Sequence, residues 1–141
     1  MASTDVVGYY QSEAKACFAV LHYVNGNLLD KDYEILPVSD SAEEAVSTLV
    51  KQYYLARNAA PKEILLPVEI EDAALFEQLL LQNLQKRVHI RVPQRGDGVR
   101  LMKRTEDAIA QSLSEIRESR TKFRALVNPQ AAKPSPIIED I

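Results

Sequence analysis

The chain has 141 residues, of which 46% are hydrophobic and 26% are charged, and its formal net charge is −3. These values are typical of one globular domain with a hydrophobic core. No apolar run approaches the roughly 18 residues that a membrane-spanning helix needs, and the first residues lack the basic and apolar parts of a signal peptide. We therefore expect a cytoplasmic protein that makes no membrane contact.

Cysteine and histidine are too scarce for two common kinds of site. Cys17 is the only cysteine, so no disulfide can form within the chain, and one cysteine with two histidines cannot make a Cys/His zinc site. Cys17 lies among Ala16, Phe18 and Val20 in an apolar, strand-like run. This context favours a buried small residue over a reactive thiol.

Charge is unevenly distributed along the chain. Residues 1–85 carry five basic and 13 acidic side chains, a net charge of −8, whereas residues 86–124 carry 11 basic and five acidic side chains, a net charge of +6. A basic segment on an acidic domain can meet nucleic acid or the acidic face of a partner. The alternative is a long helix whose charges are only solvated.

The first third of the chain is predicted to form three consecutive strands. Residues 6–10 and 16–24 are β-prone, and Asn25-Gly26 after them is a strong hairpin signal because both residues tolerate a positive φ. Residues 28–36 alternate between charged and mostly apolar side chains. That alternation predicts a strand with one wet side, near an edge of the sheet.

Helices and short strands alternate in the rest of the chain. Ser41 and Glu44 form a capping box at the start of a helix that ends near Arg57. Residues 63–68 contain a continuous apolar run that predicts a buried, parallel strand. A second helix follows Glu71-Asp72, whose charges suit a helix start, and residues 88–92 form a fifth short strand.

The predicted order is β-β-β-α-β-α-β-α, which indicates an α/β fold with a mixed five-stranded sheet and helices against it. Residues 99–127 read as one long C-terminal helix. We expect a single domain over residues 1–127, followed by a flexible, proline-rich tail over residues 128–141.

Three short motifs, in order, carry a family resemblance. They are Gln52-Tyr53-Tyr54, residues 63–67 with the sequence Glu-Ile-Leu-Leu-Pro, and residues 92–96 with the sequence Val-Pro-Gln-Arg-Gly. Together they resemble the middle region of UvrC, a subunit of the bacterial excision-repair nuclease, over residues 5–101. In that family this region precedes the catalytic RNase H-like domain. The resemblance implies an RNase H-like fold, a role in nucleotide excision repair, and DNA and UvrB-type subunits or domains as partners.

The residues that cut DNA in RNase H-like enzymes are missing from the expected place. Such enzymes hold two divalent metal ions with several carboxylates, one of them in the middle of the first strand. This chain has residues 8–11, Gly-Tyr-Tyr-Gln, at that position, and Asp5 lies at the start of the strand. We therefore expect no catalytic residue, no bound metal and no cofactor, and a non-catalytic module of an excinuclease subunit.

A basic set near the fifth strand is the candidate DNA contact. Its members flank the exit of the strand and the start of the following helix, where glycines and the helix N-terminus suit a phosphate. They are Arg91, Gln94, Arg95, Arg100, Lys103 and Arg104. The alternative is that Arg95 and Gly96 only shape a turn and the charges are solvated.

The long helix supports a second hypothesis of another class. Its apolar residues form a narrow stripe near heptad spacing, which is typical of a helix that self-associates or binds a partner helix. The stripe comprises Met102, Ile109, Leu113, Ile116 and Phe123. On this hypothesis the chain is an assembly module that either forms a homo-oligomer or binds the helix of another partner.

Overall fold

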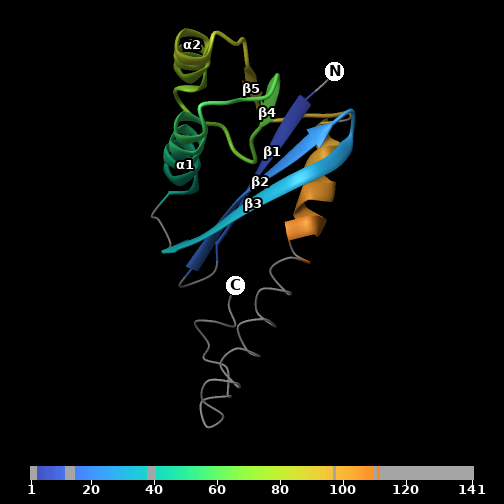
Figure 1. Cartoon of the computed structure of the whole chain (residues 1–141). Helices are drawn as coiled ribbons and strands as arrows, with labels where there is room; N and C mark the ends of the chain where they lie inside the picture. The colour runs from blue at the N-terminus through green and yellow to red at the C-terminus, as the bar shows by residue number, and fades with distance from the viewer. Residues whose placement is uncertain (1–2, 12–14, 38–40, 97, 110, 112–141) are drawn as a thin grey trace, which may run out of the picture.

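The structure is a computed structural model, and it describes residues 3–11, 15–37, 41–96, 98–109 and 111. The strands are β1 (Ser3–Gln11), β2 (Lys15–Val24), β3 (Asn27–Pro37), β4 (Glu63–Leu65) and β5 (His89–Arg91), and the labelled helices are α1 (Ala42–Arg57) and α2 (Ala73–Leu84). Residues 98–109 form a further helix, named helix 98–109 below. It is drawn in orange in Figure 1.

The five strands make one mixed sheet in the order β3-β2-β1-β4-β5. β2 pairs antiparallel with both β1 and β3, while β4 pairs parallel with β1 and with β5. The predicted α/β fold class with a mixed five-stranded sheet is confirmed. β4 and β5 are shorter than predicted, because Pro67 and Pro93 follow them closely and proline cannot donate to a strand ladder.

The N-terminal meander follows the prediction closely. Asn25 and Gly26 have φ angles of 51° and 81°, which is the left-handed turn that joins β2 to β3. β3 lies at one edge of the sheet, and its residues are mostly exposed. The alternation of its side chains therefore marked an edge strand correctly.

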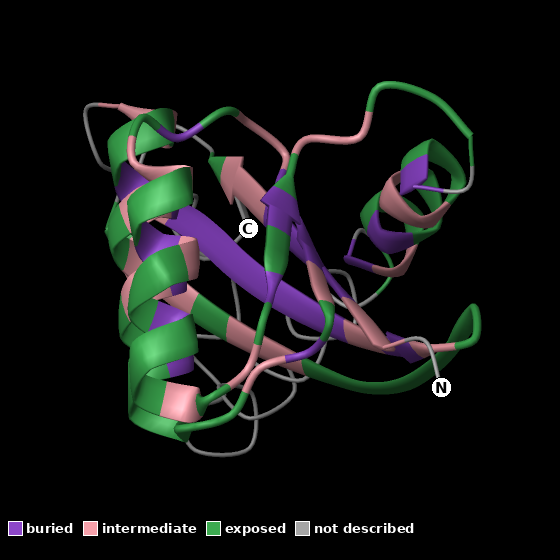
Figure 2. Ribbon diagram, turned by 90° about the horizontal axis from the view of Figure 1, so that it is seen from above, coloured by how far each residue is buried: buried purple, intermediate pink, exposed green. Residues whose placement is uncertain are grey.

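Helices cover both faces of the sheet (Figure 1). Val7 of β1 and Val20 of β2 pack with α1 and α2, whereas their neighbours Val6 and Leu21 pack on the other face with Ile109 of helix 98–109. Successive strand residues point to opposite faces, so one apolar run can serve two cores. Figure 2 shows the buried residues gathered on the strands between the two helical layers.

Both ends of α1 are capped, and the N-cap is the predicted Ser41. The Ser41 side chain accepts a hydrogen bond from the backbone N–H of Glu44 at 3.3 Å. At the other end Asn58 adopts the left-handed conformation, and its N–H donates to the carbonyl of Tyr54. These contacts fix where α1 begins and ends.

Asp72 stands at the start of α2, as predicted, and makes a contact that the sequence did not predict. Asp72 occupies the N-cap position but makes no side-chain cap hydrogen bond. Its carboxylate instead pairs with Lys51 and accepts a hydrogen bond from Ser47, both on α1. Asp72 therefore ties α2 to α1 rather than capping its own helix, and this is a tertiary contact that local sequence does not reveal.

The predicted long C-terminal helix is described only in its first part. Residues 98–109 are helical, and residues 112–127 and the expected tail 128–141 lie outside the described residues. Within the described part of the chain, no helix is both long and apolar enough to span a membrane.

Candidate functional site

The basic candidate residues lie where β5 leaves the sheet and helix 98–109 begins. Gly96 has a φ of 80°, a left-handed conformation that favours glycine, and its carbonyl accepts a hydrogen bond from the N–H of Arg100 at 3.3 Å. A Cβ on Gly98 would lie 3.0 Å from the Cβ of Pro93. The two glycines therefore let the chain reverse tightly from strand to helix.

Arg91 and Arg104 of the basic set contact residues of neighbouring strands. The guanidinium of Arg91 donates from Nε to Oε2 of Glu63 on the neighbouring strand at 2.8 Å. The guanidinium of Arg104 lies over the ring of Tyr23, 5.9 Å from its centroid. Both side chains remain exposed, but each guanidinium already interacts with another side chain of the fold.

The remaining members are grouped on the turn and the first turns of the helix. Gln94 and Arg95 are exposed on the turn, and Arg100 and Lys103 are exposed on the helix, three positions apart and so on one side of it. Their charges lie at a helix N-terminus, whose backbone N–H groups and partial positive charge also favour an anion. The arrangement suits contact with phosphate groups.

The described part of the helical stripe faces inward. Ile109 is fully buried against the sheet, and Met102 packs on the same apolar cluster. These two side chains therefore complete the chain's own core. Leu113, Ile116 and Phe123 lie outside the described residues.

The middle of β1 is apolar and closely covered. Val6, Val7 and Gly8 are buried, and a Cβ on Gly8 would lie 2.3 Å from Cδ1 of Ile109. Within the described ranges, no group of three His, Cys, Asp or Glu side chains is placed to hold a metal ion. A side chain at Gly8 would require the Ile109 side chain to move, so a carboxylate at this position would collide with Ile109 as it is placed.

A buried polar network, which sequence reasoning missed, joins three strands to α1. Asp5 on β1 is 4% exposed, and its two carboxylate oxygens accept hydrogen bonds from different elements. Nδ1 of His22 on β2 lies 2.7 Å from Oδ1, and the hydroxyl of Tyr54 on α1 donates to Oδ2 at 2.6 Å. A buried carboxylate with two donors is satisfied, whereas one without them would be costly.

The network continues to the surface through His22. Its Nε2 lies 2.8 Å from the hydroxyl of Tyr53, and that hydroxyl donates to Asp32 on β3. Arg57, one turn later on α1, donates to Asp32 at 3.0 Å and to the Tyr53 hydroxyl at 2.7 Å. With His22 protonated, both of its ring N–H groups and both tyrosine hydroxyls have acceptors, and the two cations balance the two carboxylates.

Protonation equilibria follow this geometry. The hydrogen bond from His22 to Asp5 raises the pKa of His22, although burial acts against it. The hydrogen bond from Tyr53 lowers the pKa of Asp32, helped by His22 and Arg57. Burial and the bond to Asp32 raise the pKa of Tyr53, so its phenol stays protonated and is a poor nucleophile. The network therefore fastens α1 to the three strands of the meander.

The sequence marks this network only in part. Tyr53 and Tyr54 belong to the Gln52-Tyr53-Tyr54 motif, but no spacing connects that motif to Asp5, His22 or Asp32, which lie in three separate strands. His22 alternates with apolar residues as a structural histidine does. Cys17, by contrast, is buried as predicted, and burial raises the pKa of its thiol to about 11.

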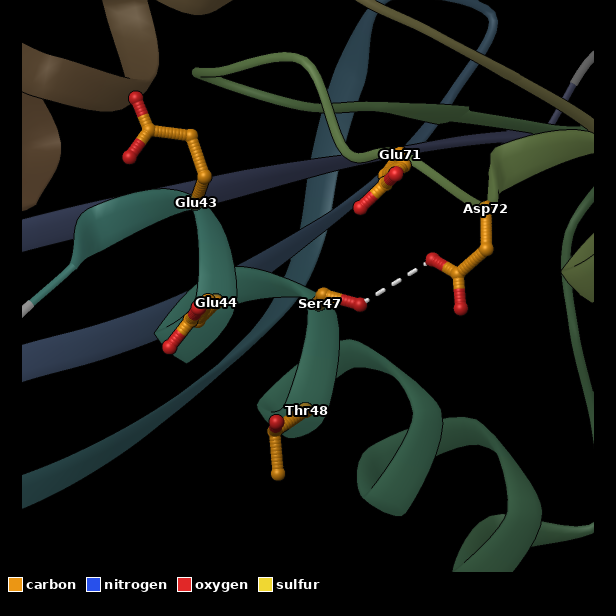
Figure 3. Close-up of a pocket in the computed structure, with 6 residues that line it drawn as sticks. All are labelled: Glu43, Glu44, Ser47, Thr48, Glu71 and Asp72. Carbon is orange, nitrogen blue, oxygen red and sulfur yellow. Dashed lines mark hydrogen bonds between the residues drawn. The ribbon is translucent and has the colours of Figure 1, made fainter.

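A separate hollow lies between the first turns of α1 and the start of α2. It is lined by Glu43, Glu44, Ser47, Thr48, Glu71 and Asp72. Figure 3 shows these side chains around the hollow and the hydrogen bond from Ser47 to Asp72. The acidic character of this hollow contrasts with the basic turn at the exit of β5.

Comparison with known proteins agrees with the fold. A family model described as the UvrC ribonuclease H-like domain matches residues 3–116. Among curated proteins, the UvrABC system protein C of Clostridioides difficile (strain 630) is 36% identical over 95 residues, covering 66% of this chain and 16% of that protein. That of Desulfatibacillum aliphaticivorans is 28% identical over 124 residues, covering 87% of this chain and 21% of that protein. The chain thus spans about a fifth of the length of these relatives.

Solved structures show more distant similarity. Human ENDOV matches with a TM-score of 0.36 and 13% identity, covering 47% of this chain and 33% of that chain. The Argonaute of Marinitoga piezophila, in complex with a 5′ OH guide RNA, matches with a TM-score of 0.37 and 13% identity. It covers 56% of this chain and 14% of that chain.

Proposed function

We propose, from the premise that the chain belongs to the UvrC ribonuclease H-like domain family, that it is a non-catalytic module of an excinuclease subunit. On this proposal it acts in nucleotide excision repair by helping to position DNA or a partner subunit of the UvrB type. The curated relatives are named UvrABC system protein C, and the chain matches only a part of each of them.

The observation that carries the non-catalytic proposal is the closed middle of β1. Gly8 lies against Ile109, and the neighbouring Val6 and Val7 are fully buried. Metal-dependent hydrolysis of a phosphodiester needs carboxylates that converge on ions at an open surface. Asp5, the carboxylate of the strand, instead has both oxygens engaged by His22 and Tyr54.

The basic turn at the exit of β5 supports the positioning role. Arg95, Arg100 and Lys103 present positive charge beside a helix N-terminus on a chain whose overall charge is negative. Such a patch binds phosphates without reading the sequence, and its affinity falls steeply with salt. This turn also contains the Gln94-Arg95-Gly96 part of the family motif.

The nuclease half of the proposal is tested with the purified full chain. Nicked, damaged and intact duplexes are incubated with Mg²⁺ or Mn²⁺, and the expected result is no cleavage above a protein-free blank. Metal-dependent cleavage that co-purifies with the chain through successive columns would show that the chain is a nuclease.

The DNA half is tested by the salt dependence of duplex binding. Arg95→Ala/Arg100→Ala is expected to weaken binding about tenfold or more and to reduce the slope of log K against log[salt] by about two. The matched control is Lys62→Ala/Arg87→Ala, which removes the same charge from exposed residues just before β4 and β5, at the opposite end of these parallel strands. If both pairs weaken binding equally, the effect is one of net charge and the basic turn is not the contact.

A further inference from the structure

A groove runs between α1 and α2 on the side of the sheet opposite helix 98–109. It consists of two adjoining hollows of about 370 and 350 Å³ that share Asp72. The first is the acidic hollow of Figure 3. The second is mainly apolar and is lined by Lys51, Leu75, Phe76, Gln78, Leu79 and Gln82. Together they are called the α1–α2 groove below.

The apolar end of the groove exposes leucines that the fold does not use. Leu75 is 66% exposed and Leu79 is 36% exposed, and they are one helical turn apart on α2. Phe76 lies between them at the base of the groove but is buried in the main core. Burial of such apolar surface is favourable by about 25 cal/mol per Å², so this end favours an apolar partner.

The other end of the groove is acidic. Glu44 and Glu71 are exposed at its rim, and Glu43 and Asp72 complete the lining. Lys51, the cation that lines the neighbouring hollow, is already paired with Asp72. An occupant that carries positive charge beside its apolar side chains would therefore be attracted to this end.

The chain itself contains a segment with this combination. Residues 113–127 include the apolar side chains of Leu113, Ile116, Phe123 and Val127 together with four basic and two acidic residues. The basic residues are Arg117, Arg120, Lys122 and Arg124. Thirty residues of the chain, from 112 to 141, follow the last described position, so the segment is long enough to contribute a docking element.

We propose that the α1–α2 groove binds residues 113–127 of a second copy of this chain. A second copy is the source because helix 98–109, from which the segment continues, packs on the face of the sheet opposite α1 and α2 (Figure 1). The apolar side chains of the segment cover Leu75 and Leu79, and its arginines meet Glu44 and Glu71. The groove shares no residue with the basic turn, so this proposal does not depend on whether the chain binds DNA.

The first test is the mass of the full chain in solution, measured by sedimentation equilibrium without nucleic acid. The wild-type chain is expected to exceed its monomer mass of 15.8 kDa as its concentration rises. Leu75→Ser/Leu79→Ser is expected to weaken association about tenfold or more. The matched control Leu29→Ser/Leu55→Ser changes leucines of similar exposure, 67% and 43%, on β3 and on a part of α1 that does not line the groove, and should associate as the wild type does.

The second test exchanges the charges across the contact. Glu44→Lys/Glu71→Lys and Arg117→Glu/Arg120→Glu should each weaken association, because like charges then face one another. A chain with all four substitutions should recover it. Circular dichroism of each variant confirms that the fold is retained, since the substituted groove residues are all exposed.

Three results would overturn the proposal. One is a wild-type chain that remains a monomer at all concentrations, and another is association that the groove substitutions leave unchanged. The third is a monomer in which Phe123→Ser alters the chemical shifts of Leu75 and Leu79, because the segment would then occupy the groove of its own chain.

Discussion

Asparagine at position 5 is the change that tests the buried network most directly. Asp5→Asn keeps the size and shape of the side chain but removes its charge and one of its two acceptor oxygens. In the native chain those oxygens accept from His22 and from Tyr54. The asparagine amide can satisfy only one of these two donors as an acceptor, so the other faces an N–H₂ group.

The expected loss of stability follows from one hydrogen bond to a buried charge. Such a bond contributes about 1.5–3 kcal/mol, and at 4% exposure water cannot replace it. With a urea m-value of about 2 kcal/mol per M, the midpoint of unfolding should fall by about 1 M. Domains of this size are stable by about 5–15 kcal/mol, so the variant still folds.

The pH dependence separates the charge of Asp5 from its hydrogen bonds. The folded chain raises the pKa of His22 through Asp5 above the ordinary histidine value of 6.5. The His22–Asp5 pair therefore stabilises the fold fully below that ordinary value, and this stabilisation is lost as the pH rises through the raised pKa. Asp5→Asn should flatten this decline and return the pKa of His22 toward its ordinary value.

Urea unfolding at pH 6 and pH 8.5, followed by circular dichroism, measures both effects. The chain has only two histidines, so a proton NMR titration reads the pKa of His22 directly. Tyr54→Phe removes a hydrogen bond to Asp5 without changing the His22 pair, so it should lower stability but keep the pH dependence. Glu34→Gln makes the same isosteric change at an exposed position and should alter neither. An Asp5→Asn variant as stable as the wild type, or with the same pH profile, would refute this account.

Three further predictions concern other parts of the fold. Gly8→Ala should lower the free energy of unfolding by about 1–3 kcal/mol, because its Cβ would lie 2.3 Å from Cδ1 of Ile109. Ile109→Val in the same chain should recover part of this loss. A Gly8→Ala variant that melts at the same temperature as the wild type would contradict this packing. Burial raises the pKa of Cys17 to about 11, so its thiol should react with a disulfide reagent at pH 8 only after urea is added. Rapid labelling of the native chain would show instead that the thiol is accessible. Lys51 lowers the pKa of Asp72, so Lys51→Gln should lower the free energy of unfolding by less than about 1 kcal/mol at pH 7. In an acid titration, the difference in stability between the variant and the wild type should vanish as the pH falls through the pKa of Asp72. A difference that persists at pH 2 would mean that Lys51 acts through packing.

Local patterns predicted most of the elements because each depends on neighbouring residues. The Asn25-Gly26 turn, the Ser41 cap and the edge character of β3 all follow from conformational preference or alternation within a few residues. The boundaries of β4 and β5 were less accurate. The predicted bounds followed the apolar runs, whereas pairing ends earlier, next to Pro67 and Pro93.

The candidate sites also differ in whether local sequence could reveal them. The basic residues could be proposed as a site because they lie close together in the sequence, around glycines that mark a reversal, and their contact with DNA stays a prediction. The Asp5–His22–Tyr54 contact was not predicted, because its members come from two strands and a helix and carry no spacing that signals their contact. The inward direction of Met102 and Ile109 also depended on the sheet face that helix 98–109 covers.

The sequence by itself determined the element order, the polar turn chemistry, the scarcity of ligating residues and the family. Only the tertiary structure decided which side chains meet: that Asp5 is buried with two donors, that Asp72 joins two helices, and that Gly8 lies beneath Ile109. Backbone conformational preferences depend on a few neighbouring residues, so a short stretch of sequence is enough to predict them. Burial and hydrogen bonding between distant residues depend on the register and layering of the whole sheet, which no short stretch of sequence specifies.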